Sequence, residues 1–173
     1  DSVRGVAWSP CSKWIASVSW DKTVVLWDAA RGSEIKKFEH ASWVLSVDFS
    51  PDLRQIVSGC RDGKITIFDI ESGREVRQLV GHAQQVNSVR WRGNFIASGS
   101  GKNGGPFDNS DVTVSDDSSD NSLRLWSADD GREIWRKQHA KAVNSVDFSR
   151  DGSRVASACR DGLVRVFAVP SGD

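Results

Sequence analysis

The chain of 173 residues has the usual length of one domain, and its 23 basic and 23 acidic residues balance to a formal net charge of zero. This balance indicates no general attraction to nucleic acid or to an anionic membrane, and no apolar run approaches the roughly 20 residues that a membrane span needs. The three cysteines form no Cys-x-x-Cys pair, and their odd number favours a reducing compartment. We therefore expect the cytoplasm, with the nucleus as the alternative. No signal peptide is visible and methionine is absent, so we expect an excised or processed segment.

The first forty residues predict four short strands joined by tight turns. Residues 3–10 alternate apolar and polar side chains, as a strand with one buried face does. Residues 14–19 and 23–28 continue with strands, the second of them rich in β-branched and aromatic residues. A fourth strand, 32–38, opens with a glycine. No helical periodicity competes with these strands, so the unit is all-β.

The same pattern returns three times along the chain. The further strands are expected at 44–51, 55–60, 64–69 and 73–79, then at 86–92, 94–100, 122–127 and 131–137, and last at 143–150, 154–159 and 163–168. One unit of ~41 residues is therefore repeated. We expect a single segment, 1–173, with repeats at about 1–39, 40–80, 81–138 and 139–173 and fifteen strands in all. The third repeat carries an insertion, 99–119, and the fourth lacks its last strand.

The repeat resembles the WD-repeat (WD40) family over the whole chain. Each unit offers a histidine before its first strand, a serine in the second, an aspartate in the next turn and an aromatic residue in the third. These columns are His40, His82 and His139; Ser17, Ser58, Ser98 and Ser157; Asp21, Asp62, Asp120 and Asp161; Trp27, Phe68, Trp126 and Phe167. The resemblance implies a β-propeller of four consecutive four-stranded blades, as part of a seven- or eight-bladed ring.

Four blades in an arc leave two faces uncovered, because each unit of a repeat array buries its apolar surface only against its neighbours. The candidates for these faces are Val6, Val24 and Trp27 in the first blade and Val146, Val164 and Phe167 in the last. The chain is then a piece of a longer propeller, pairs with a second copy, or closes alone. We favour the first of these three arrangements.

His82, Ser98 and Asp120 have the residue types of a nucleophilic hydrolase. The alternative is a buried relay, in which the aspartate orients the histidine, the histidine bonds the serine and Trp126 closes the chain. Two more sets occupy the same columns, His40–Ser58–Asp62 and His139–Ser157–Asp161, and Ser17, Asp21 and Trp27 are the first-blade members. An active site has no reason to recur in register, and no strained glycine-rich elbow surrounds the serines. The prediction is a structural hydrogen-bond network, with no catalytic residue, no cofactor and no metal site.

The resemblance places the histidine loop and the aspartate turn at one end of the propeller, so the residue before each turn aspartate projects from that face. Trp and Arg are typical of interface hot spots, and a leucine lies next to them in the repeat. The partner-binding candidates are Trp20, Trp43, Leu45, Arg61 and Arg160. The alternative is that both tryptophans pack on the blades and the arginines are merely solvated.

Residues 101–119 are rich in glycine and then in serine and aspartate, a composition typical of a solvated loop. Thr113 and Ser115 are followed by aspartates, which makes them candidates for acid-directed phosphorylation. An inert insertion is the description that we favour.

Members of the WD-repeat family act mainly as rigid platforms for other proteins, which leads us to expect a non-catalytic protein–protein interaction scaffold that uses its loop-bearing face. The first alternative is a regulatory or sensor module of a larger signalling or catalytic polypeptide. The second is a reader of modified peptides, which needs an aromatic cage. The expected partners are proteins or peptides, not nucleic acid or a membrane, together with self-association or completion by further blades.

Overall fold

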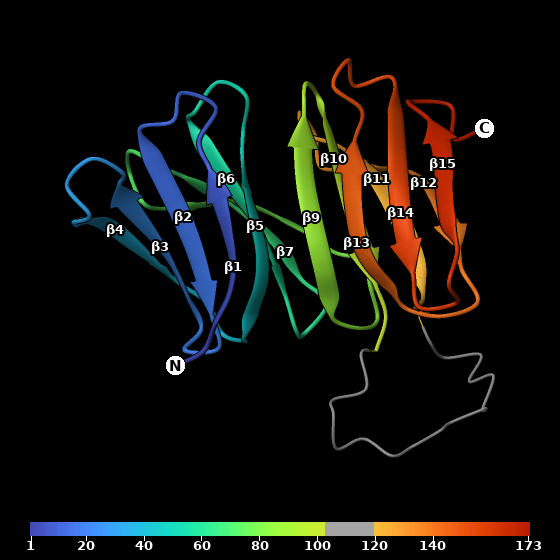
Figure 1. Ribbon diagram of the computed structural model, residues 1–173, viewed down its shortest axis with the longest axis horizontal. Coiled ribbons are helices and arrows are strands. Elements are labelled where there is room, and N and C mark those ends of the chain that lie inside the picture. Colours follow the sequence, from blue (N-terminus) through green and yellow to red (C-terminus); the bar gives the residue numbers. More distant parts are fainter. Residues whose placement is uncertain (103–119) are drawn as a thin grey trace.

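A computed structural model describes residues 1–102 and 120–173. Within these residues the chain folds into fifteen strands and no helix, which confirms the expected all-β architecture (Figure 1). The strands form four antiparallel sheets, one for each repeat, which we call blades 1 to 4. In the part of the chain that the structure describes, no helix is long and apolar enough to cross a membrane.

Consecutive strands are neighbours in every blade, so each sheet is a simple meander. Blade 1 consists of β1 (Val3–Trp8), β2 (Trp14–Ser19), β3 (Thr23–Asp28) and β4 (Glu34–Glu39), and blade 2 of β5 (Val44–Phe49), β6 (Gln55–Cys60), β7 (Ile65–Asp69) and β8 (Glu75–Leu79). Blade 3 consists of β9 (Val86–Arg92), β10 (Phe95–Ser100), β11 (Ser122–Ser127) and β12 (Glu133–Gln138). Blade 4 has three strands, β13 (Val143–Phe148), β14 (Arg154–Cys159) and β15 (Val164–Ala168).

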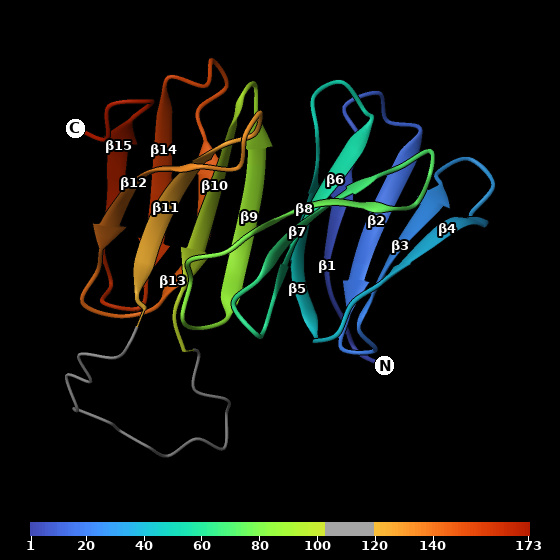
Figure 2. The same cartoon turned by 180° about the vertical axis from the view of Figure 1, so that it is seen from behind.

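The first strands of the four blades lie side by side, β1 against β5, β5 against β9 and β9 against β13, while the fourth strands lie outermost (Figures 1 and 2). Backbone amides of one blade donate to side chains of the blade before it. The Val89 amide donates to Ser46 Oγ at 3.1 Å, and the Trp91 amide donates to Asp48 Oδ2 at 2.8 Å. These bonds hold consecutive blades together along the inner edge.

The first strand of every blade contains a β-bulge near its start. The strand pairing skips one residue there, and the skipped residues are Arg4, Leu45, Asn87 and Asn144. A bulge twists the strand locally and re-aims a side chain. It therefore sets where these four side chains point at the loop-bearing end.

Three hydrophobic cores lie between consecutive blades, and the aromatic residue of each third strand belongs to the core shared with the preceding blade. Phe68 packs with blade 1, where its ring centroid lies 5.3 Å from that of Phe38. Trp126 packs with residues of blade 2, and Phe167 packs against residues of blade 3. A blade without a preceding neighbour must therefore leave this side of its sheet open.

Blade 1 shows such an open face. Val6 and Trp8 occupy the same repeat positions as Val47 and Phe49. They are 65% and 58% exposed, whereas Val47 and Phe49 are 3% and 2% exposed. Trp27 is half-buried on the same blade. The difference follows from the neighbour that blade 2 has and blade 1 lacks.

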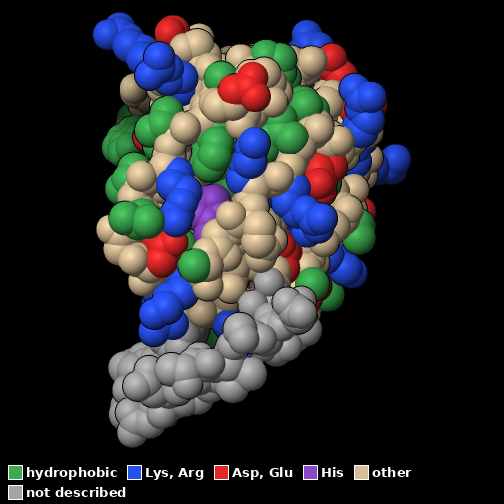
Figure 3. All heavy atoms as spheres, turned by 90° about the vertical axis from the view of Figure 1, so that its right-hand side faces the viewer, with side chains coloured by type: hydrophobic (Ala, Val, Ile, Leu, Met, Phe, Trp, Pro, Cys, Tyr) green, Lys and Arg blue, Asp and Glu red, His purple; other side chains and the backbone are tan. Residues whose placement is uncertain are grey.

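Blade 4 has the complementary open face. Val164 and Val166 are 71% and 53% exposed, although Ile65 and Ile67 at the same repeat positions are buried. Figure 3 looks onto the side of the molecule where β15 lies and shows apolar side chains among lysines and arginines. The two open faces show that the ring is not closed between blades 4 and 1, and they fit a partial propeller.

Three of the expected face residues lie elsewhere. Val24 and Val146 are buried and Phe167 is half-buried, because each points to the side of its sheet that a neighbouring blade covers. Successive residues of a strand point to opposite faces, so a choice between adjacent positions decides which face a valine occupies. Of the six candidates, Val6 and Val164 mark the open faces best.

Candidate functional site

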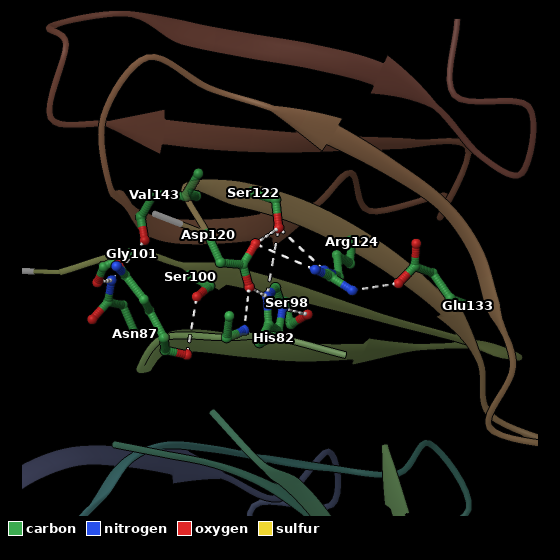
Figure 4. Close-up of polar contacts among 12 residues, drawn as sticks. His82, Asn87, Ser98, Ser100, Gly101, Asp120, Ser122, Arg124, Glu133 and Val143 are labelled. Carbon is green, nitrogen blue, oxygen red and sulfur yellow. Dashed lines mark hydrogen bonds and ion pairs between the residues drawn. The ribbon is translucent and has the colours of Figure 1, made fainter. Parts of the chain in front are cut away.

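The complete histidine relay forms in blade 3 (Figure 4). His82 Nδ1 lies 2.6 Å from Asp120 Oδ2, and His82 Nε2 lies 2.7 Å from Ser98 Oγ. The Trp126 indole N–H donates to the same hydroxyl at 2.8 Å. All four side chains are buried. The relay thereby joins the loop before β9, the middle of β10, the segment just before β11 and the end of β11.

Charge and burial settle the protonation of this relay. Burial lowers the pKa of His82, although the hydrogen bond to Asp120 opposes the shift. His82 is therefore neutral near pH 7, donates from Nδ1 to Asp120 and accepts the Ser98 hydroxyl at Nε2. Burial also raises the pKa of Asp120, but hydrogen bonds from His82 and Ser122 and the charge of Arg124 outweigh it and hold this pKa well below its usual range.

The relay continues into a buried ion pair. Arg124 Nη2 lies 3.3 Å from Asp120 Oδ1, and Arg124 Nη1 lies 2.6 Å from Glu133 Oε2 (Figure 4). The neutral histidine and the paired arginine together satisfy the Asp120 carboxylate. Removing one partner of such a buried set leaves the others unsatisfied, which is strongly destabilising.

Blade 2 forms only part of the expected relay. His40 Nε2 lies 3.2 Å from Ser58 Oγ, but His40 Nδ1 faces Cys60 Sγ at 3.3 Å instead of Asp62. Asp62 accepts the Lys64 amide within the turn that follows β6. The Ser58 hydroxyl donates to the Thr66 carbonyl oxygen, so it accepts a hydrogen bond from His40 Nε2. Burial raises the pKa of Cys60 to about 12, so its thiol is protonated and donates to His40 Nδ1.

Blade 4 also replaces the aspartate. His139 Nε2 lies 2.8 Å from Ser157 Oγ, while His139 Nδ1 donates to a backbone carbonyl, Lys137 O, at 3.1 Å. Asp161 pairs with Arg165 at 2.7 Å and does not bond to the histidine. In both blades the aspartate finds a partner closer in sequence than the histidine.

Blade 1 retains the serine–indole part of the network. The Trp27 indole N–H donates to Ser17 Oγ at 2.8 Å. Asp21 accepts the hydroxyl of Thr23 at 2.6 Å within its own turn. The position equivalent to His40 would precede residue 1, so blade 1 contributes no histidine to this network.

The predicted rim residues Trp20 and Trp43 stack on one another, Trp20 directly after β2 and Trp43 directly before β5. These strand ends lie at the lower end of the molecule in Figure 1, where the N-terminus lies. Their ring centroids are 4.9 Å apart, with 26° between the planes. The Arg61 guanidinium carbon lies 4.3 Å from the centroid of Trp43. Arg4, outside the candidate set, lies 4.8 Å from the centroid of Trp20. We call Arg4, Trp20, Trp43 and Arg61 the Arg–Trp stack.

The remaining rim candidates lie outside this stack. Leu45 is the half-buried bulge residue of β5. Arg160 is exposed in blade 4, where its amide donates to Ala142 O at 2.9 Å. Thr113 and Ser115, the phosphorylation candidates, lie in 103–119, outside the described residues. The sequence contained one signal for Arg4, since it has the same repeat position as Leu45.

A cavity of about 790 Å³ opens at the opposite end of the first strands. Trp8, Trp91 and Phe148 line it together with Arg90 and Asp147. Trp8 is exposed there because blade 1 has no preceding neighbour, and most of the other lining residues come from blades 2 to 4. Among residues 1–102 and 120–173, no group of three or more His, Cys, Asp or Glu side chains is placed to hold a metal ion.

Comparison with known families gives a match to the WD domain, G-beta repeat, at residues 1–28, 32–69, 73–127 and 133–167. These ranges cover most of the chain. The chain belongs to the WD40 repeat family. Repeats of this family generally serve as scaffolds for protein interactions.

Individual relatives support the same assignment. The chain is 29% identical to the WD40 repeat protein poxJ of Penicillium oxalicum, over 100% of this chain and 47% of the relative. It is 26% identical to a guanine nucleotide-binding protein subunit beta of Oryza sativa subsp. japonica, over 98% of this chain and 56% of the relative. A poly(A)+ RNA export protein of Schizosaccharomyces pombe is 36% identical over 53% of this chain and 26% of the relative. The chain therefore spans about half the length of the first two of these relatives.

Proposed function

We propose that this WD40 segment is a non-catalytic scaffold that holds partner proteins at its loop-bearing rim. The observation that carries the proposal is the contrast between its two polar features. The hydrolase-like set is enclosed, since Ser98 has no exposed surface and its hydroxyl is hydrogen-bonded to both His82 and Trp126. The exposed arginines of the rim, in contrast, are oriented by aromatic rings, and Trp and Arg are the residues that dominate protein interfaces.

The two other candidate functions have different support. A regulatory module within a larger polypeptide agrees with the length of the relatives and is compatible with a scaffold role. A reader of modified peptides that uses an aromatic cage needs open aromatic faces around a cation. The stack offers none, because one face of each indole lies against the other indole and a guanidinium lies over each ring. We further propose a reducing compartment, the cytoplasm, for a protein with three free cysteines.

The test is affinity capture of proteins from a cell lysate by the wild-type chain and by Arg4→Ala/Arg61→Ala. Partners held by the rim are expected to be lost from the double variant and retained by Arg74→Ala, which removes an exposed arginine from the opposite end. Capture that is equal for all three chains contradicts the proposal. A wild-type esterase activity that disappears in His82→Ala contradicts the non-catalytic part.

A further inference from the structure

The Arg–Trp stack belongs to one blade junction only. Backbone bonds identify the equivalent positions, since the amides of Trp20, Arg61, Gly101 and Arg160 each donate to the carbonyl of the residue before the first strand of their blade. Those carbonyl residues are Ser2, Trp43, Gln85 and Ala142. Where the stack has Trp43, the next two blades have Gln85 and Ala142, and they still pack in register. Blade packing therefore does not require the stack.

The order of the rings in the stack leaves the edges of the two guanidinium groups free to form hydrogen bonds. Trp20 and Trp43 cover one face of each other, and Arg4 and Arg61 lie over the remaining faces. A guanidinium that stacks on a ring through its own face keeps its N–H groups at the rim of its plane. Both arginines are exposed, and neither forms an ion pair within the described residues.

The neighbouring carboxylates are already engaged. Asp21, next to Trp20, accepts the amide and the hydroxyl of Thr23, and this bonding lowers the pKa of Asp21. Asp62, next to Arg61, accepts the Lys64 amide. The stack therefore presents two oriented cations without matching anions.

We propose that the Arg–Trp stack binds an acidic segment of a partner protein, with carboxylates of that segment paired to Arg4 and Arg61. This deepens the proposed scaffold function and rests on it. Guanidinium and carboxylate groups form paired, charge-assisted hydrogen bonds, which are stronger than neutral ones. The indoles hold both arginines in place, so less side-chain freedom is lost when the acidic segment binds.

Two isolated cations fit a short acidic peptide better than a nucleic acid. Nucleic-acid binding proteins present a basic stripe that neutralises many phosphates. This chain has zero formal net charge, and the stack supplies only two arginines. Two pairing sites are enough for the carboxylates of a short acidic segment, whereas a nucleic-acid backbone needs many more phosphate contacts.

The experiment measures fluorescence anisotropy of a labelled glutamate-rich peptide, with the full chain as titrant at low salt. The wild type is expected to bind this peptide and to ignore a glutamine-rich peptide of the same length. Arg4→Ala/Arg61→Ala is expected to weaken binding by about tenfold or more. The matched control is Arg74→Ala, which removes an exposed arginine at the opposite end of the blades and is expected to leave the affinity within about twofold.

A second variant keeps the test informative if loss of both arginines disturbs the fold. Arg4→Lys/Arg61→Lys retains the charges but not the planar N–H groups, and a partial loss of affinity is expected. Equal binding by the wild type and both double variants overturns the proposal, as does equal binding of the glutamine peptide. Binding of a labelled oligothymidylate in place of the glutamate peptide overturns it in favour of nucleic acid. Rim-dependent capture of proteins without glutamate binding leaves the scaffold function standing and rejects only the acidic partner.

Discussion

Trp20 and Trp43 belong to different blades, yet their indoles lie face to face with centroids 4.9 Å apart. Trp20 follows β2 of blade 1, and Trp43 precedes β5 of blade 2. Both are half-buried. The pair therefore joins two blades at the same place where it displays arginines to solvent, and packing and partner binding have to be separated by experiment.

A double-mutant cycle measures the packing part. Trp20→Ala and Trp43→Ala are each expected to lower the free energy of unfolding, with a coupling of about 1 kcal/mol for the stacked pair. Urea denaturation of the wild type, the two single variants and the double variant supplies the four values. Strictly additive losses would show that the rings do not stabilise one another. Because Trp20→Ala affects stability, a partner-binding defect is better assigned from the arginine variants.

Loss of His82 is expected to lower the free energy of unfolding, and no catalytic activity is expected to depend on this residue. His82→Ala strands Asp120 and Ser98, which costs about 1–3 kcal/mol for the buried groups left without partners. The measurement is the urea midpoint and slope. Arg74→Ala, an exposed change in the same protein, serves as the control with a loss below about 0.5 kcal/mol. Equal stability of His82→Ala and the wild type would contradict the relay.

Stability is expected to fall as the pH is lowered toward 4. Burial lowers the pKa of His40 from its ordinary value of 6.5 to about 4, so the unfolded chain binds this proton first. The stabilising effect of the neutral histidine is complete above pH 6.5 and is lost progressively down to about pH 4. The pKa of His82 is lowered in the same direction.

Between pH 7 and about pH 4.5, the free energy of unfolding is expected to fall by about 2 kcal/mol because of His40 alone. Urea titrations at the two pH values measure this difference. His40→Gln cannot take up the proton, so its stability is expected to depend less on pH over this interval. A wild-type stability that rises as the pH falls would contradict the assignment of a neutral, buried histidine.

Cys11 and Cys60 are expected to differ in their reactivity toward thiol reagents and in their contribution to the stability of the fold. Cys60 is buried against His40, and burial raises its pKa to about 12, whereas Cys11 is exposed and a hydrogen bond from Ser9 lowers its pKa. A thiol reagent is expected to modify Cys11 in the native chain and Cys60 only after unfolding. Cys60→Ala should cost about 1–2 kcal/mol, and Cys11→Ala almost nothing. Rapid native modification of Cys60 would show that blade 2 opens readily.

The two open faces are expected to make the isolated segment associate. Val6 and Val164 are exposed at repeat positions that are buried inside the array, and exposed apolar patches of this kind invite association. Light scattering should report species larger than a monomer, reduced by Val6→Lys and Val164→Glu. Val47→Lys, at the buried equivalent of Val6, is the control and is expected to unfold the chain. A clean wild-type monomer would show that the faces are inert.

The strands were predictable because their signals are local. Alternation of apolar residues and the spacing of turn aspartates placed all fifteen of them, and repetition made each assignment support the others. The distinction between Val6 and Val24 was harder, since it depends on which face of a sheet a neighbour covers. That information lies in the packing of blades and not in the periodicity of one strand.

The hydrogen-bond partners of the relay were predictable only in the repeat that has all four residues of the set. In blade 3, His82, Ser98 and Asp120 meet as expected. In blade 4 the sequence contained an aspartate in the same column, but Asp161 bonds to Arg165, four residues away. The choice between two possible partners depends on side-chain rotamers, which a column of equivalent residues does not encode.

Because each third-strand aromatic belongs to the core shared with the preceding blade, every boundary between neighbouring sheets is written by the same few columns of the repeat. Duplication or excision of one entire unit therefore keeps an aromatic third-strand residue at every remaining boundary. A break inside a unit divides a sheet instead, so lineages that lengthen or shorten such proteins are expected to do so in steps of whole repeats.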